Sequence, residues 1–486
     1  MRNGALTGAR FVLLAGPVAL AFFSGGYFDG PRAWAGLVAW ALVALSLLAA
    51  RRPLPRVAGP RLAIGGLGLL AVWTLASLAW APIADSAYDA GQLAFLYAGV
   101  LFAATALLRP RSALRSVEPA LAAGALVVVG YGISERLVPG VLHFHHSISA
   151  EGRLEQPLTY WNAMGEAAAF GLVLCARLAG DATRPSPMRI AAAVAAAPIG
   201  LGLYLSFSRG ALFAAAAGLV ALIVAAPRRE QLRSAGLTLG AAAVAAAISA
   251  PLHGVTGLAG SLGSREREGA VVLVVLVVVM TAAGLGQRAL VRRGATGPLA
   301  LPRHAGLIAL GLVIGLFALS LAVGSSETST APLSGGATRY TTLRTNRYAY
   351  WHVALRAFAD EPVRGVGAGG WAVYWLRLRR IDEGAQDAHS LYLQTAAELG
   401  LIGLALLAAF LGGVFWAARD ALRVAPGLAA GPIAGFVVWL AHVALDWDWQ
   451  MPAVTLTALI LAGALLSLSE LSGVGRPPRT RAVARS

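Results

Sequence analysis

The sequence predicts an all-α polytopic membrane protein, and three observations support this fold class. Hydrophobic residues make up 58% of the 486 residues, and the mean hydropathy of +0.69 is far above that of ordinary soluble domains. Apolar stretches long enough to cross a bilayer as helices recur from one end of the chain to the other. The arginines, which are the only basic residues besides histidine, concentrate in alternate connections between these stretches.

Composition also excludes several classes of function. A net charge of +16 in a soluble protein would suggest nucleic acid, but here it is explained by membrane topology and contact with anionic lipid, so we expect no nucleic-acid partner. Cys175 is the only cysteine, which excludes an intramolecular disulfide and a cysteine metal site. The first apolar stretch, 11–28, lacks a small-residue cleavage site and is interpreted as a retained helix.

The apolar stretches predict about 12–14 transmembrane helices. Fourteen are placed at 11–28, 33–50, 62–81, 90–108, 118–138, 161–179, 190–206, 210–226, 235–251, 269–288, 305–323, 389–416, 428–445 and 452–470. The chain then divides into an N-terminal helix bundle at 1–323, a large loop at 324–388, C-terminal helices at 389–475 and a basic tail at 476–486.

The arginine distribution predicts the orientation of the chain. If the first residues are cytoplasmic, 25 of the 39 arginines lie on the cytoplasmic side, and eight of the remaining 14 lie in the loop 324–388. The positive-inside rule therefore places both termini in the cytoplasm and the loop outside. We expect a multi-pass protein of the cytoplasmic membrane with an extracytoplasmic active site.

The outer connections carry most of the polar motifs. Residues 139–160 form a polar connection that we interpret as a solvated loop, although its three histidines could bind metal. Two helices are joined by the short turn 206–210. In the large loop, apolar residues recur at steps of three and four in 347–361 and 370–380, which predicts two amphipathic helices lying on the outer leaflet with the aromatic face down.

Arginines beside the outer leaflet suit a lipid diphosphate, because guanidinium binds phosphate oxygens bidentately and remains charged. The candidates are Arg209, Arg339, Arg344, Arg347, Arg356 and Arg364. Arg209 is the most informative, because a two-helix turn this short has no evident need for a charge; the alternative is an arginine that snorkels to head groups. For Arg356, and for the arginines at 377, 379 and 380, a solvated face is the better interpretation.

His389 lies where the large loop re-enters the membrane. An imidazole can accept a proton near neutral pH and could activate an acceptor hydroxyl, although a capping role is the simpler interpretation of one histidine alone. Asn162 is similarly either a helix cap or a substrate ligand. Glu166, inside an apolar stretch, is expected to face the bundle interior or a cavity.

Six motifs, in order along the chain, resemble the O-antigen ligase and polymerase family. They are Pro157-x-x-Tyr160-x-Asn162-x-x-Gly165, Ser206-x-Ser208-Arg209-Gly210, Arg347-x-x-Tyr350-Trp351, Pro362-x-x-Gly365-x-Gly367-x-Gly369, His389-Ser390-x-Tyr392 followed by Glu398-Leu399-Gly400-x-x-Gly403, and His442-x-x-x-Asp446 followed by Pro452. The first 150 residues resemble the family only in hydrophobicity.

The resemblance implies a GT-C-type glycosyltransferase that works outside the cytoplasmic membrane. Its donor would be a glycan linked to a polyprenyl diphosphate such as undecaprenyl diphosphate, and its acceptor a glycan or lipid hydroxyl. Carried over by motif, Arg209 and Arg347 bind the diphosphate and His389 is the base or the group that positions the acceptor. Arg339, Arg344, Asn162, Tyr350 and Trp351 are the further substrate-binding candidates. Relatives are regarded as metal-independent, so no metal site and no cofactor is expected.

Two other classes of function are consistent with parts of the sequence. A metal-dependent transferase using lipid-monophosphate sugars could place a divalent cation at Asp446 and Asp448, or at Asp85 and Asp89. A non-enzymatic flippase of lipid-linked oligosaccharides would need charged residues along a central cavity, whereas these arginines gather at one face. The acceptor, the sugar, the oligomeric state and the choice between ligase and polymerase are not determined by the sequence.

Overall fold

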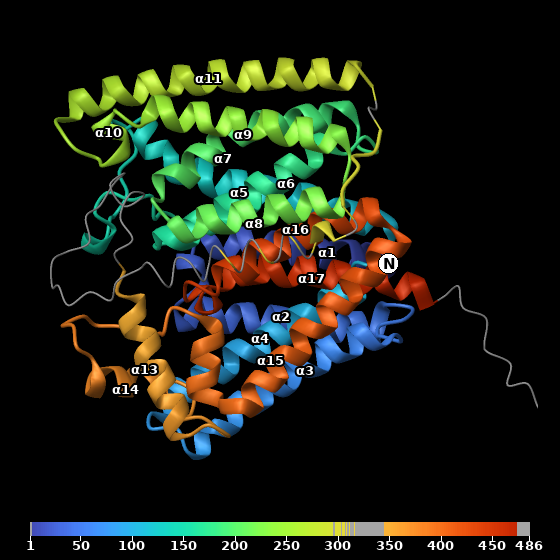
Figure 1. Cartoon of the computed structure of the whole chain (residues 1–486), viewed down its shortest axis with the longest axis vertical. Coiled ribbons are helices and arrows are strands. Elements are labelled where there is room, and N and C mark those ends of the chain that lie inside the picture. The colour runs from blue at the N-terminus through green and yellow to red at the C-terminus, as the bar shows by residue number, and fades with distance from the viewer. Residues whose placement is uncertain are drawn as a thin grey trace, which may run out of the picture.

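The structure is a computed structural model that describes residues 2–294, 297–302, 304–306, 308, 311, 315 and 345–473. Within these residues the chain is a bundle of helices without a β-strand. The bundle helices run side by side, with α11 at one edge and α3 and α15 at the other (Figure 1). The predicted fold class, an all-α polytopic membrane protein, is confirmed.

The long helices match the predicted spans in order. They are α1 (Arg2–Ala21), α2 (Asp29–Ala49), α3 (Ala58–Ala76), α4 (Ala84–Leu107), α5 (Arg111–Leu137), α6 (Trp161–Gly180), α7 (Ser186–Leu205), α8 (Arg209–Ala225), α9 (Arg229–Ser249), α11 (Leu262–Arg292), α15 (Leu391–Val424), α16 (Pro426–His442) and α17 (Pro452–Gly473). Eleven of them are long and apolar enough to cross a membrane, and α8 and α16 are shorter apolar helices. The predicted span at 305–323 lies mostly outside the described residues.

The first helix differs from its predicted position. The apolar stretch suggested 11–28, but α1 ends at Ala21 and a short 3₁₀ turn, η1 (Ser24–Gly26), follows. Gly25 and Gly26 have φ angles of +67° and +80°, a left-handed conformation that suits glycine and stops the helix. The chain therefore turns toward α2 seven residues before the apolar stretch ends.

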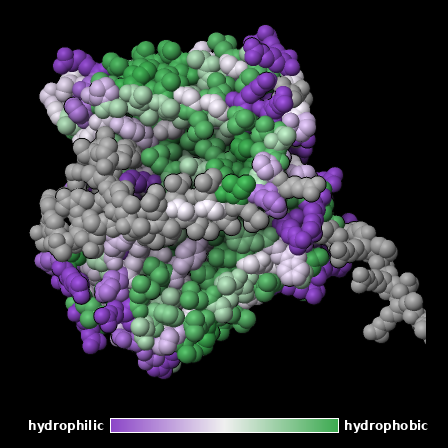
Figure 2. All heavy atoms as spheres, viewed as in Figure 1, coloured by the Kyte–Doolittle hydropathy of each residue, from purple (hydrophilic) through white to green (hydrophobic). Residues whose placement is uncertain are grey.

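Burial separates central helices from peripheral ones. The membrane-spanning windows of α6 and α17 are 94% buried, whereas that of α1 is 22% buried and those of α2 and α11 are 28% buried. The C-terminal helices are part of the same bundle, since α16 packs on α8 and α17 packs on α1 and α4. On the face that Figure 2 shows, hydrophobic residues dominate between the two ends, and hydrophilic residues gather at the left and right. This apolar belt is the surface that a bilayer would cover.

Alternate connections meet at opposite ends of the bundle. At one end the Trp80 indole donates to the carbonyl of Gly365, and the amide of Leu391 donates to the carbonyl of Val443. At the other end Arg109 donates to the carbonyl of Leu54. The first end also carries α10 (His253–Thr256), α13 (Arg347–Asp360) and α14 (Gly370–Leu378), at the left of Figure 1. We call it the α13 end.

The helices α13 and α14 exist as predicted, but their aromatic faces do not lie on the membrane. Trp371 and Trp375 of α14 are fully buried, and Tyr350 of α13 packs edge-on against both rings. Together with residues before and inside α15 they form a small second core. The expectation of an aromatic face pressed into the outer leaflet was wrong, because periodicity shows which face is buried but not against what.

Candidate active site

A buried ion pair lies at the centre of the α13 end. Nη2 of Arg347, the first residue of α13, donates to Oδ2 of Asp446 over 2.7 Å. Asp446 lies in the connection between α16 and α17 and is fully buried, whereas the Arg347 side chain is 19% exposed. The guanidinium is therefore held by a carboxylate on its inner side and reaches the surface on the other.

The other oxygen of Asp446 is held as firmly. The Tyr160 hydroxyl donates to Oδ1 over 2.7 Å, and the amide of Trp447 donates to the same atom over 2.9 Å. Asn162 in turn donates from Nδ2 to the Tyr160 hydroxyl over 2.8 Å. Three segments far apart in sequence thus converge on one carboxylate.

The environment keeps Asp446 ionised. Burial alone would raise the pKa of this carboxyl, but the charge of Arg347, the neighbouring His389 and His442 and the bond from Tyr160 outweigh it and lower the pKa below its ordinary value. Burial, with the adjacent Asp446 charge, raises the pKa of the Tyr160 hydroxyl, so the phenol stays protonated and donates.

His389 lies close to this pair and has a fixed tautomer. Its backbone is left-handed, with φ +52°, directly before α15. Nδ1 lies 2.9 Å from the carbonyl oxygen of Asp387. A carbonyl only accepts, so Nδ1 carries a proton, and in the neutral ring Nε2 carries the lone pair. The ring packs against Tyr350, with centroids 4.9 Å apart, and lies 6.5 Å from the Trp447 ring.

Arg209 approaches the site from a different turn. Ser208 caps α8 by accepting the amide of Ala211, and Phe207 is left-handed, with φ +48°. The turn packs tightly on α6, because a Cβ on Gly165 would lie 2.7 Å from the Ser206 hydroxyl oxygen. Arg209 is half-buried, and its charge partly offsets the rise that burial causes in the pKa of Tyr348, the neighbour of Arg347. The turn thus brings a second arginine to the α13 end.

A second cluster of ionisable groups lies behind the ion pair. Glu166, His442 and Asp448 are fully buried, and one potential ligand atom of each lies within 4.8 Å of the others. His442 Nδ1 is 2.5 Å from Asp448 Oδ2 and 3.6 Å from Glu166 Oε2. Burial raises the pKa of Asp448, although His442 opposes this rise. Among the described residues this group has the geometry to hold a metal ion.

Glycines in the Pro/Gly connector allow the backbone to pass between packed elements. Gly365 and Gly367 have φ angles of +74° and +90°. A Cβ on Gly365 would lie 2.2 Å from the backbone of Glu398, and one on Gly367 would lie 2.5 Å from the backbone of Ala81. Gly400 breaks α15 where the connector crosses it, with φ +64°. The spacing of the motif therefore reflects close backbone packing that holds α13, α14 and α15 together.

The structure brings most of the predicted site residues together. Arg347 and His389 lie at one place, and Asn162 acts through Tyr160 rather than as a helix cap, since Tyr160 occupies the cap position. Tyr350 and Trp351 are buried, with Tyr350 between His389 and α14. Arg339 and Arg344 lie outside the described residues.

Other residues have partners that the sequence did not indicate. Asp446 and Asp448, which the alternative of a metal-dependent transferase placed at one cation, have separate partners: Asp446 binds Arg347 and Asp448 faces His442. Arg364 forms an exposed ion pair with Glu361. The partner role of Asp446 could have been suspected from its place in a motif, since a buried carboxylate near an arginine-rich loop needs a cation.

The histidine-rich connection is also not simply solvated. Nε2 of His146 lies 2.8 Å from Glu135, and Nδ1 lies 3.5 Å from Glu155. These two hydrogen-bonded carboxylates raise the pKa of His146 to about 9. Glu155 lies in the same connection, whereas Glu135 belongs to α5, so the sequence spacing alone did not indicate that both carboxylates meet His146.

The fold and this site define a multi-pass helical membrane protein with a cationic site at one end of its bundle. Residues 252–408 match a family model described as O-antigen ligase. This match supports an assignment to the O-antigen ligase and polymerase family, and with it a membrane enzyme of polysaccharide assembly. The match includes Arg347 and His389, whereas Arg209, Asn162 and Asp446 lie outside it. No curated protein matches the chain.

Proposed function

We propose that this protein transfers a glycan from a polyprenyl-diphosphate donor to a hydroxyl group of a glycan or lipid acceptor. The observation that carries the proposal is the position of Arg347, held by buried Asp446 on one side and exposed on the other, next to a histidine whose Nε2 has its lone pair available. A fixed cation and a base at one place suit a displacement with an anionic leaving group.

The donor end of the reaction depends on charge. When the bond between the anomeric carbon and the diphosphate oxygen breaks, the oxygen keeps the electron pair and negative charge grows on the leaving group. Arg347 and Arg209 stabilise that charge, with guanidinium forks that match phosphate oxygens. Asp446 orients Arg347 before the reaction, so little reorganisation is needed when the charge develops.

The acceptor end depends on His389. Its Nδ1–H bond to the Asp387 carbonyl orients the ring, and Nε2 removes the proton of the acceptor hydroxyl as the oxygen attacks the anomeric carbon. The proton resides on the imidazole and the diphosphate leaves, so the products are one new glycosidic bond and a free polyprenyl diphosphate. A single displacement of this kind inverts the anomeric configuration.

The site faces outward in this proposal. The arginine count of the connections opposite the α13 end supports an extracytoplasmic position for that end at the cytoplasmic membrane, with both termini inside. Reporter fusions after Gly384 and at the C-terminus test the orientation. A cytoplasmic signal from the fusion after Gly384 would contradict it.

A metal-dependent lipid-monophosphate transferase is the second candidate, because Glu166, His442 and Asp448 could hold a divalent cation. Activity lost with EDTA and restored by a divalent cation would favour it. A flippase finds less support, because the Arg347–Asp446 pair and His389 lie at one end of the bundle.

The experiment that tests the proposal uses purified protein with a polyprenyl-diphosphate glycan and an acceptor. Arg347→Lys should transfer poorly, because an ammonium cannot reproduce the planar fork. Arg364→Lys is the matched control, since this exposed arginine of the same region pairs with Glu361 away from the site. Equal activity of the two variants would remove Arg347 from the mechanism.

A further inference from the structure

An open apolar groove runs along the membrane-facing side of the bundle between α1 and α2. Its volume is about 690 Å³, within the range of ligand-binding pockets, and α4 and α17 form its floor. Every side chain that lines it is apolar. Phe11, Phe23 and Trp34 flank it and are largely exposed. A groove of this composition at membrane depth takes hydrocarbon rather than water.

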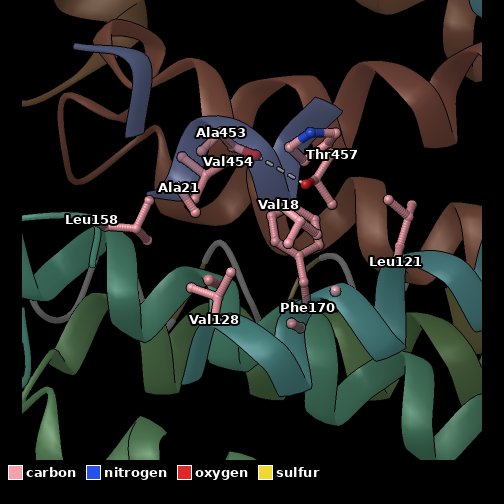
Figure 3. A pocket seen from close by; sticks show the side chains of 13 residues that line it. Val18, Ala21, Leu121, Val128, Leu158, Phe170, Ala453, Val454 and Thr457 are labelled. Atoms are coloured by element: carbon pink, nitrogen blue, oxygen red, sulfur yellow. Dashed lines mark hydrogen bonds between the residues drawn. The ribbon is translucent and has the colours of Figure 1, made fainter. Parts of the chain in front are cut away.

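Small residues keep the groove open. Gly16 of α1 and Gly30 of α2 both line it, and a Cβ on either would meet nothing within 4 Å. The opposite side of α1 is different. There Val18 and Ala21 pack among Leu121, Phe170 and Thr457, and the space left is only about 30 Å³ (Figure 3). Helix α1 is therefore fixed on its inner side and leaves a gap toward α2.

The groove leads to the candidate active site. Phe23 and Gly30 line one end of the groove, and they border the connection between α1 and α2 that carries Tyr27. The Tyr27 ring contacts the Trp447 ring, with centroids 5.4 Å apart, and its hydroxyl donates to Gln386. Trp447 directly follows Asp446, and Gln386 lies three residues before His389. A chain in the groove thus ends beside the residues that we assign to glycan transfer.

A buried cation marks the same end. Arg32 follows Pro31, which lines the groove, and its side chain donates to the carbonyl of Tyr27. Arg32 is 9% exposed, and its Nε has no hydrogen-bond partner in the described part of the chain. An apolar groove with a buried guanidinium on the residue next to its lining has the charge pattern that suits a lipid with an anionic head group.

We propose that this groove holds the polyprenyl chain of the lipid-diphosphate donor. The inference rests on the proposed function and adds the place where the lipid binds. A polyprenyl diphosphate has one long chain and an anionic head group, which suits a groove between two helices that ends near Arg32 and Trp447. Seating the chain there restricts the head group to the α13 end, so the anomeric carbon is presented to Arg347 and His389.

The first arm of the test measures binding and does not depend on transfer. A photoreactive benzoylphenylalanine replaces Ala19, which lines the groove, or Val277, an outward-facing residue of α11 that serves as control. The full-length protein is placed in phosphatidylethanolamine and phosphatidylglycerol vesicles with undecaprenyl diphosphate and irradiated. We expect prenyl adducts at 19 and not at 277. Adducts only with phospholipid or with a second copy of the chain would overturn the proposal.

The second arm measures transfer with a long-chain and a short-chain donor. Gly16→Leu fills the groove, whereas Gly8→Leu places the same side chain in open space on the same helix outside it. Gly16→Leu should raise KM for the long-chain donor about tenfold, because a few buried methylene groups lose their contacts. The short-chain donor should be unaffected. Equal effects on both donors, or equal effects of both variants, would contradict the groove, while absence of transfer in the wild type would contradict the proposed function.

Discussion

Replacing Asp446 with asparagine removes the charge that faces the Arg347 guanidinium while keeping the size of the side chain. The carboxylate is fully buried and accepts from Arg347, Tyr160 and the Trp447 amide at 2.7–2.9 Å. Loss of one charge-assisted hydrogen bond costs about 1.5–3 kcal/mol. Because Arg347 is only 19% exposed, little of this cost is recovered from water. We expect the free energy of unfolding to fall by that amount.

The effect on transfer follows from the same bond. An Arg347 that is no longer oriented loses a comparable contribution to the leaving diphosphate, so kcat/KM should fall by roughly 10- to 150-fold. Transfer of glycan by purified protein measures this value, and Glu361→Gln, which removes the carboxylate of an exposed arginine pair, is the control. If Asp446 only competed with substrate for Arg347, the asparagine variant would bind donor more tightly and transfer at least as fast. That result would refute the orienting role.

A double-mutant cycle separates the pair from its surroundings. The free energy of unfolding is measured for Arg347→Met, for Asp446→Asn and for the double variant. The two single losses of stability should not add, because each variant removes the same interaction. The lowered pKa of Asp446 also predicts how stability depends on pH. The pair contributes fully to the free energy of unfolding above the ordinary carboxyl pKa of 3.8, and this contribution is lost as the pH falls through the lowered folded-state pKa.

Three further outcomes are expected. His389→Ala should reduce the transfer rate by about 10²–10⁴-fold while still binding donor. His389→Gln should recover part of the rate if the ring mainly positions the acceptor. A normal transfer rate in the alanine variant would exclude His389 as the base. The His146 contacts should stabilise the 139–160 connection below pH 6.5 and weaken as the pH rises through about 9. Hydrogen-exchange protection factors there, which correct for the intrinsic pH dependence of exchange, should therefore fall over this range in the wild type but stay constant in His146→Gln. Gly365→Ala should lower the melting temperature, because an alanine in this left-handed conformation costs about 1–3 kcal/mol and its Cβ also clashes with the backbone of Glu398. Gly412→Ala, at a position in α15 that faces open space, is the control and should be neutral or stabilising.

Hydropathy predicted the helices well because membrane-spanning length and apolar composition are local properties. Where it failed, the cause was local conformation or tertiary packing. The end of α1 was misplaced because Gly25 and Gly26 stop the helix inside an apolar run. The aromatic faces of α13 and α14 were assigned to lipid because periodicity does not distinguish a protein surface from a bilayer.

The candidate site was predicted in part. Arg347 and His389 were recognised through their motifs, and the structure places them near each other. The carboxylate that pairs with Arg347 comes from a connection 99 residues further along the chain. Its motif marked Asp446 as a residue of interest, but the spacing along the chain does not show that it contacts Arg347. The Glu166, His442 and Asp448 cluster has the same origin, since its members belong to α6, α16 and the turn before α17.

The central claim is that a glycosidic bond forms as a polyprenyl diphosphate is released. The most direct measurement follows both products in one reaction of purified protein with a defined polyprenyl-diphosphate glycan and acceptor. We predict one free polyprenyl diphosphate for each glycan transferred, with both products lost together in Arg347→Ala and retained in Arg364→Ala. Glycan transfer that releases a lipid monophosphate instead, or that proceeds at the normal rate in Arg347→Ala, would contradict the account.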